Sequence, residues 1–127
     1  MLEAGGRPTS DIRVLVVEDS EDQAGLLTRY FERAGCTVEV VGTGEEAVTA
    51  YRRCPPDVAV IDLQLPGMDG WELSGRMRIE RPEVAIVITS VLDVREFPRA
   101  HATLPKPFTG EQVRSTLAAV LPERMAS

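Results

Sequence analysis

Apolar residues gather along the chain in short runs that are rich in β-branched side chains and separated by polar segments. Three of these runs are almost continuously apolar, which is typical of strands buried on both faces of a parallel sheet. The runs predict five strands, at residues 12–17, 37–41, 57–61, 84–88 and, from the weakest pattern, 101–104.

The segments between the strands have a helical spacing of apolar residues and share a start signal. In each, a short polar residue is followed three positions later by Glu or Gln, which is the capping-box pattern or close to it. The pairs are Ser20 with Gln23, Thr43 with Glu46, Asp69 with Glu72, and Thr109 with Gln112. They predict helices at 21–34, 44–53, 70–80 and 109–121, and the alternation of strands and helices predicts a doubly wound α/β fold.

The composition argues against several kinds of function. The 127 residues carry a net charge of −6, which disfavours a general nucleic-acid-binding surface. Cys36, Cys54 and the single His101 are not at metal-ligand spacing, so no zinc site is expected. No run approaches the ~18 apolar residues of a membrane span. Residues 1–10 lack an apolar signal core and are expected to form a flexible arm, so we expect a cytoplasmic protein.

Chemically informative side chains follow the predicted strands, at the sheet edge where doubly wound folds place their sites. Glu18 and Asp19 follow the first strand, Asp62 the third, Thr89 the fourth, and Lys106 the fifth. Clustered carboxylates raise one another's pKa unless a cation is present. Three acids at a water-accessible edge suit Mg²⁺, with Mn²⁺ as the alternative ion. Taken singly, each of these residues also has an ordinary structural explanation, such as a helix cap.

Lys106 is the only lysine in the chain, and it lies between Pro105 and Pro107. All other basic side chains are arginines. Lysine is a compact point charge with rotatable donors, whereas arginine is a broad planar fork. The use of lysine at position 106 therefore indicates a small cation that must fit among acidic groups.

Four motifs, VLVVEDSE, VIDLQLPGMDG, IVITS and LPKPF, occur in an order that resembles the receiver domain of two-component response regulators. The resemblance covers residues 11–122 and leaves 123–127 as a tail or the start of a linker. It implies a flavodoxin-like, five-stranded parallel sheet in the order 2-1-3-4-5, surrounded by five helices.

The resemblance further implies an Mg²⁺ site and a phosphoacceptor. Asp62 would accept the phosphoryl group and would also bind the metal. Asp19 would be a second direct ligand and the backbone carbonyl of Gln64 a third, while Glu18 would bind through water.

Two more residues are implied to contact the phosphoryl group itself. Thr89 would donate its hydroxyl, and Lys106 would pair first with Asp62 and then with the phosphoryl oxygens. The bond between Lys106 and Pro107 is expected to be cis, which is physically reasonable for an X–Pro bond in a tight turn.

The function implied by the resemblance is that of a signalling phosphoacceptor in a two-component phosphorelay. A histidine kinase or histidine phosphotransfer protein would donate the phosphoryl group. The domain would assist only its own phosphorylation and dephosphorylation, so it is not expected to be an enzyme. Output would pass through altered protein–protein contacts with an unknown partner, from a monomer or weak dimer with no direct contact to nucleic acid or membrane.

Two features depart from the family pattern. The stretch 91–100 is short and contains Pro98, which cannot continue a helix, so the fourth helix is expected to be shortened or missing. Thr103 stands three residues before the lysine, where receivers usually carry the Tyr or Phe ring that links the site to the output face. The output mechanism is therefore expected to be altered.

These departures leave an alternative open, in which the chain is a pseudo-receiver that binds proteins without being phosphorylated. The intact acids, Thr89 and Lys106 argue for the phosphoacceptor. An enzyme on the same architecture fits less well. The acidic loop after the first strand does not suit a flavin phosphate, and Gln64 replaces the second Asp of an aspartate-type phosphatase.

Overall fold

The computed structural model describes residues 12–122, so the predicted arm at 1–10 and the tail at 123–127 lie outside the described residues. The strands are β1 (Arg13–Val17), β2 (Thr37–Val41), β3 (Val58–Asp62), β4 (Ala85–Thr89) and β5 (Ala102–Thr103). The α-helices are α1 (Glu21–Arg33), α2 (Gly44–Arg53), α3 (Gly70–Glu80) and α4 (Gly110–Val120). Each predicted element is present, with its ends shifted by at most one residue.

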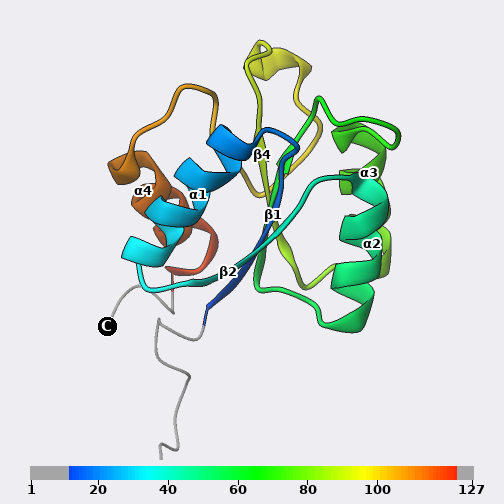
Figure 1. Ribbon diagram of the computed structural model, residues 1–127, viewed down its shortest axis with the longest axis horizontal. Coiled ribbons are helices and arrows are strands. Elements are labelled where there is room, and N and C mark those ends of the chain that lie inside the picture. Colours follow the sequence, from blue (N-terminus) through cyan, green and yellow to red (C-terminus); the bar gives the residue numbers. More distant parts are fainter. Residues whose placement is uncertain (1–11, 123–127) are drawn as a thin grey trace, which may run out of the picture.

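All strands belong to one parallel sheet in the order β2-β1-β3-β4-β5, which confirms the predicted fold class. Helices α1 and α4 cover one face of the sheet, and α2 and α3 cover the other (Figure 1). Every residue of β3 and β4 is buried, because both faces of these strands are covered. That burial explains why their sequences are almost continuously apolar.

Two apolar cores lie against the sheet, one on each face. The first includes Tyr51 of α2 and Met77 of α3, and the second includes Phe31 of α1 and Leu117 of α4. All four side chains are fully buried. Each large side chain removed from water stabilises the fold by about 1.5–3 kcal/mol, so these contacts hold the helices against the sheet and fix the loops at its edge.

The helices begin where the sequence predicts. The side chains of Ser20, Thr43, Asp69 and Thr109 each accept a hydrogen bond from the backbone N–H three residues later. Among the described helices, only α4 has the complete capping box, in which Gln112 accepts the N–H of Thr109 in return. The other three sites are simple N-caps, which still satisfy one otherwise unpaired donor each.

The segment between β4 and β5 contains the 3₁₀ helix η2 (Val94–Glu96). No α-helix forms within the described residues 91–100, as the short stretch before Pro98 predicts. The fourth α-helix is present, but it follows β5 and is the helix predicted at 109–121. Residues 12–122 therefore contain four α-helices, fewer than the five that the resemblance implies.

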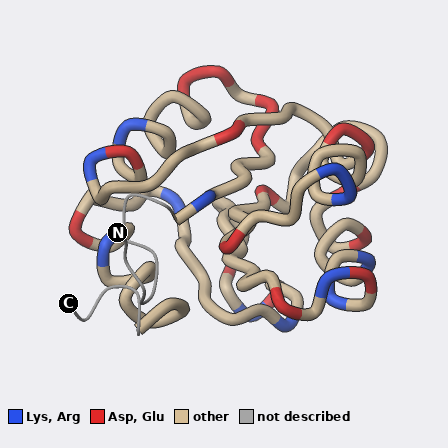
Figure 2. The backbone as a smooth tube through the Cα atoms, turned by 90° about the horizontal axis from the view of Figure 1, so that it is seen from below, with Lys and Arg blue, Asp and Glu red and all other residues tan. Residues whose placement is uncertain are grey.

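The surface of the described chain is polar and mixed in charge. Acidic and basic residues are interspersed over the helices and loops (Figure 2). Within residues 12–122, no helix is both long enough and apolar enough to cross a membrane.

Candidate functional site

Three carboxylates meet at the carboxyl ends of β1 and β3. One oxygen each from Glu18, Asp19 and Asp62 lies within 4.8 Å of the other two. Glu18 and Asp62 are buried, whereas Asp19 is exposed. The parallel strands bring these acids together, because the carboxyl ends of adjacent strands share one edge of the sheet.

Lys106 reaches two of these acids from the loop after β5. Its Nζ lies 2.8 Å from Oε1 of Glu18 and 3.3 Å from Oδ2 of Asp62. Burial alone would lower the pKa of the Lys106 ammonium, but the hydrogen bond to Glu18 and the charges of both acids raise it above its usual value. Lys106 is therefore a firmly held cation at neutral pH.

The pKa of Glu18 is shifted mainly by its burial, because a buried carboxylate is less well solvated. Burial raises the pKa of Glu18, and the charge of Asp62 adds to the rise. Hydrogen bonds from Lys106 and from the N–H of Ser20 to its carboxylate work against that rise. The net direction is upward. The cluster also contains three acids and one lysine, so the acidic groups outnumber the cation.

Thr89 lies beside Asp62, because these two residues are register partners at the ends of β4 and β3. Thr89 is fully buried, and within the described structure its hydroxyl has no hydrogen-bond partner. Buried hydroxyls are nearly always paired. An unpaired one next to a carboxylate indicates that a further acceptor belongs at this position.

The loops after β3 and β4 are fixed by their own hydrogen bonds. The N–H of Gln64 donates to Oδ1 of Asp62 at 3.1 Å, and the Gln64 side chain is exposed. The N–H of Lys106 donates to the carbonyl of Ser90 at 2.9 Å. The bond from Lys106 to Pro107 is cis. The first hydrogen bond orients the Asp62 carboxylate, and the second joins the loop of Lys106 to the loop after β4.

Gly70 is a supporting residue that the sequence patterns did not single out. A Cβ at this position would lie 2.4 Å from the carbonyl oxygen of Asp62 and 2.6 Å from Cα of Leu63. No side chain fits in that space, so only glycine lets the first turn of α3 pack against the end of β3. The sequence pattern does not predict this contact, because Gly70 and Asp62 are eight positions apart and belong to different elements.

Two residues near β5 complete the description. Thr103 lies in β5, is exposed, and pairs in register with Ile88. His101 falls within the strand that the sequence predicts at 101–104. It is exposed, but it precedes β5, and its Nδ1 accepts the N–H of Ile86 at 2.9 Å. The imidazole therefore extends the short pairing between β4 and β5.

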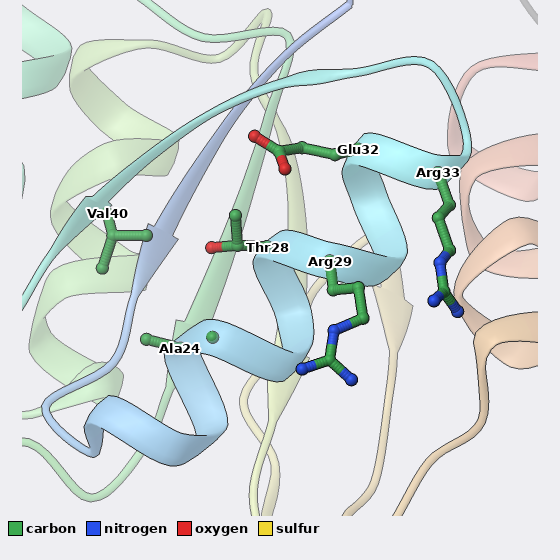
Figure 3. Close-up of a pocket in the computed structure, with 7 residues that line it drawn as sticks. Ala24, Thr28, Arg29, Glu32, Arg33 and Val40 are labelled. Carbon is green, nitrogen blue, oxygen red and sulfur yellow. The ribbon is translucent and has the colours of Figure 1, made fainter.

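The carboxylates do not lie in the larger surface hollows. One hollow of about 600 Å³ lies between α1 and β2 (Figure 3), lined by Ala24, Gly25, Thr28, Arg29, Glu32, Arg33 and Val40. Another, of about 320 Å³, opens beside the lysine and is lined by Gln23, Leu26, Val91, Lys106, Pro107 and Phe108. The second hollow is mostly apolar and borders the acidic cluster.

The donor set suits a hard divalent cation. Three carboxylates offer oxygen ligands, the cluster has an excess of negative charge, and one acid is exposed to water. Mg²⁺ binds through one or two carboxylates, retains waters and prefers a phosphate oxygen as a further ligand. The unpaired Thr89 hydroxyl and the Lys106 ammonium are hydrogen-bond donors beside Asp62.

Comparison with known proteins identifies the family. Residues 14–118 match the model of the response regulator receiver domain. The chain is 32% identical over 127 residues to the protein named "Probable transcriptional regulatory protein TcrX" of Mycobacterium tuberculosis. That alignment covers 95% of this chain and 53% of the relative, so the chain spans about half of its length.

Solved structures agree with this match. The receiver domain of Francisella response regulator 1452 has a TM-score of 0.77 and 25% identity, covering 89% of this chain and 98% of that one. The response regulator TrrA of Thermotoga maritima, solved with Mg²⁺ and BeF, has a TM-score of 0.81, covering 87% of this chain and 100% of that one. Its 22% identity supports the fold alone. The family match over residues 14–118 and the shared fold show that this chain belongs to the response regulator receiver domain family.

Proposed function

We propose that this chain is a phosphoacceptor whose Asp62 receives a phosphoryl group from a phosphohistidine on a partner protein. The observation that carries the proposal is the geometry around Asp62. A buried carboxylate lies between a lysine ammonium at 3.3 Å and a buried threonine hydroxyl without a partner. These are the donors that a phosphorylated aspartate needs.

Asp62 acts as the nucleophile in this proposal. One of its carboxylate oxygens forms a bond to phosphorus while the phosphorus–nitrogen bond of the donor breaks, and the released imidazole takes up a proton. Lys106 and Thr89 donate hydrogen bonds to the phosphoryl oxygens, over which the transferring charge is spread. Oδ1 of Asp62 is already oriented by the N–H of Gln64, so positioning contributes as well.

A divalent ion fits the cluster of Glu18, Asp19 and Asp62. Asp19, Asp62 and the backbone carbonyl of Gln64 would hold Mg²⁺, with Glu18 acting through water. Mg²⁺ or Mn²⁺ bound there would neutralise charge on the acids and on the phosphoryl group.

The donor would approach from the hollow beside Lys106. That surface combines Leu26 and Phe108 with the polar Gln23 and the lysine itself. An apolar surface next to the phosphoacceptor suits a helical face of a histidine kinase or histidine phosphotransfer protein that carries the phosphohistidine. We infer that the domain assists only its own phosphorylation and dephosphorylation and has no outside substrate.

One alternative retains a specific observation in its favour. Thr103 has no aromatic ring, and only η2 lies between β4 and β5. The aromatic side chain and the helix that usually link the site to the output face are therefore missing from the described part of the chain. A pseudo-receiver that binds partners without phosphorylation would tolerate both changes. It would not require the unpaired Thr89 hydroxyl next to Asp62, and for that reason we favour the phosphoacceptor.

The test is incubation with acetyl phosphate and Mg²⁺, followed by measurement of the intact mass. We expect one phosphoryl adduct, which is lost when Mg²⁺ is chelated and is absent in Asp62→Asn. The matched control is Asp69→Asn, which changes a nearby carboxylate that only caps α3 and should still be phosphorylated. Absence of any adduct would favour the pseudo-receiver, and turnover of added phosphate esters would favour an enzyme.

A further inference from the structure

The outer face of α3 carries two large apolar side chains that remain exposed to solvent. Trp71 is 39% exposed and Ile79 is 83% exposed. Together with Gly75 they are spaced four residues apart, so the three positions form one stripe along the helix. Single exposed apolar residues are ordinary. Two large ones aligned on one short helix form a patch that suits a partner.

Gly75 lies in the middle of this stripe. A Cβ at Gly75 would meet nothing within 4 Å, so packing inside the molecule does not require a glycine there. This contrasts with Gly70 in the same helix, where a Cβ would clash with the backbone. Glycine is a poor helix former, and its benefit at a surface position is that another backbone can approach closely.

The tryptophan ring is already held in place. Nε1 of Trp71 donates to the carbonyl of Glu96 in η2 at 3.1 Å. A ring fixed by its polar end and left partly exposed loses little further freedom on binding. Tryptophan is enriched among the residues that contribute most of the binding energy in protein interfaces.

Charged residues flank the stripe on both sides. At 100° per residue, Glu72 and Arg76 lie on one flank and Arg78 lies on the other. In the described part of the chain, none of these three side chains forms an ion pair. Arg76 acts on Glu80 only at longer range, since that carboxylate is already paired with Arg52 at 2.8 Å.

We propose that α3 packs antiparallel against α3 of a second copy of this chain, with the two-fold axis passing beside Gly75. When a two-fold axis relates two antiparallel helices, each flank of α3 lies opposite the same flank of the other copy. The order of residues along that flank is reversed. Trp71 then lies beside Ile79 of the second copy. Glu72 faces Arg76, and Arg78 lies over the Trp71 ring, where a cation–π contact is favourable.

The charges distinguish this arrangement from others. In a parallel pair, each flank would face the opposite flank of the other copy, which brings Arg76 beside Arg78 and leaves Glu72 without a nearby basic partner. The antiparallel pair brings opposite charges together twice, once on each side of the axis. A single helix face is smaller than a standard interface, so the dimer is weak and depends on concentration. The pairing does not require phosphorylation, and its test is independent of the proposed function.

Sedimentation velocity over a range of protein concentrations tests the dimer directly. We expect reversible dimerisation of the wild-type chain at high concentration. Trp71 is the only tryptophan in the chain, so its emission should shift to shorter wavelength as the dimer forms. Gly75→Arg should lower the association constant by about tenfold or more. The arginine has open space in the monomer, so the thermal midpoint at low concentration should not fall.

Charge-reversal variants test whether Glu72 and Arg76 face each other across the dimer interface. Glu72→Arg and Arg76→Glu should each weaken the dimer, and the double variant should restore it, because the pairing is exchanged rather than lost. Val40→Glu on the exposed edge of β2 should leave association unchanged. A strictly monomeric wild type, or a double variant no better than the single ones, would overturn the proposal. Loss of dimerisation in Val40→Glu would move the interface to the sheet edge and would overturn it as well.

Discussion

The ammonium of Lys106 lies closer to Glu18 than to the proposed phosphoacceptor, with Nζ 2.8 Å from Oε1 of Glu18 and 3.3 Å from Oδ2 of Asp62. The expected partner of the lysine was Asp62. Both acids are buried, and the ammonium lies within ion-pair distance of each. In the unphosphorylated protein, Lys106 therefore compensates both acids at once.

The first prediction concerns the shape of this cation. Lys106→Arg keeps the charge, but the planar guanidinium does not fit between two carboxylates and a phosphoryl group. We expect labelling by acetyl phosphate to slow by about tenfold or more, because the donors are displaced. Time courses of intact mass check this expectation. A wild-type rate in Lys106→Arg would show that the size of the cation is unimportant.

Removal of the cation should also affect stability. Lys106→Met leaves two buried carboxylates without their partner, and we expect the free energy of unfolding to fall by about 2 kcal/mol without Mg²⁺. Added Mg²⁺ should recover more stability in this variant than in wild type, since it replaces the missing charge. Urea unfolding with and without the metal measures both values.

The second prediction concerns metal binding. Mg²⁺ at about one hundred times its dissociation constant should raise the free energy of unfolding by about 2.7 kcal/mol, because it binds only the folded cluster. Asp19→Asn should remove most of this effect. Glu111→Gln changes an exposed acid of α4 and should leave it intact. An equal response in Asp19→Asn and wild type would place the metal elsewhere.

The pH dependence follows from the direction of the Glu18 shift. The pKa of Glu18 in the folded protein lies above its ordinary value, so the folded state binds the proton more tightly than the unfolded state. Between those two pKa values, stability without metal should fall as pH rises. Glu18→Gln should flatten that slope. Melting curves across mildly acidic pH, with and without the substitution, measure it.

The third prediction uses two glycines of α3. Gly70→Ala should lower the free energy of unfolding by about 2 kcal/mol or more and slow phosphorylation, because the Cβ presses on the carbonyl of Asp62. Gly75→Ala is the matched control, since its Cβ meets nothing within 4 Å. It should stabilise the monomer by up to about 1 kcal/mol. Similar effects of the two substitutions would contradict the close approach at Gly70.

The fourth prediction concerns the sheet edge. His101→Ala removes the acceptor of the Ile86 N–H, which should cost about 1 kcal/mol and speed hydrogen exchange of that amide. His101→Asn places a side-chain oxygen near the same position and should recover part of the protection. If the Ile86 amide exchanges equally in all three proteins, the imidazole does not contribute to the sheet.

Much of the site could be predicted because it depends on local signals. Strands buried on both faces are continuously apolar, and their ends therefore locate Asp62 and Thr89. The helix caps are equally local. Once the strand order is known, parallel strands bring Glu18, Asp19 and Asp62 to one edge without further information.

Other features depend on contacts between residues far apart in the sequence and could not be predicted from it. The closeness of Gly70 to Asp62 arises from the path of a loop, not from a pattern. The bond from Ile86 to His101 joins residues 15 positions apart in the sequence, next to the two-residue strand β5. The shorter distance from Lys106 to Glu18 depends on the path of the loop after β5, which a sequence does not state.

Direct identification of the modified residue tests the central claim. The wild-type protein is incubated with acetyl phosphate and Mg²⁺ and then treated with borohydride, which reduces an acyl phosphate to the alcohol. Peptide mass spectrometry of the digest locates the reduced residue. We expect homoserine at position 62 and at no other acidic position, with none formed when Mg²⁺ is chelated. Reduction at Glu18 or Asp19, or an unreduced Asp62 in a protein that carries phosphate, would contradict it.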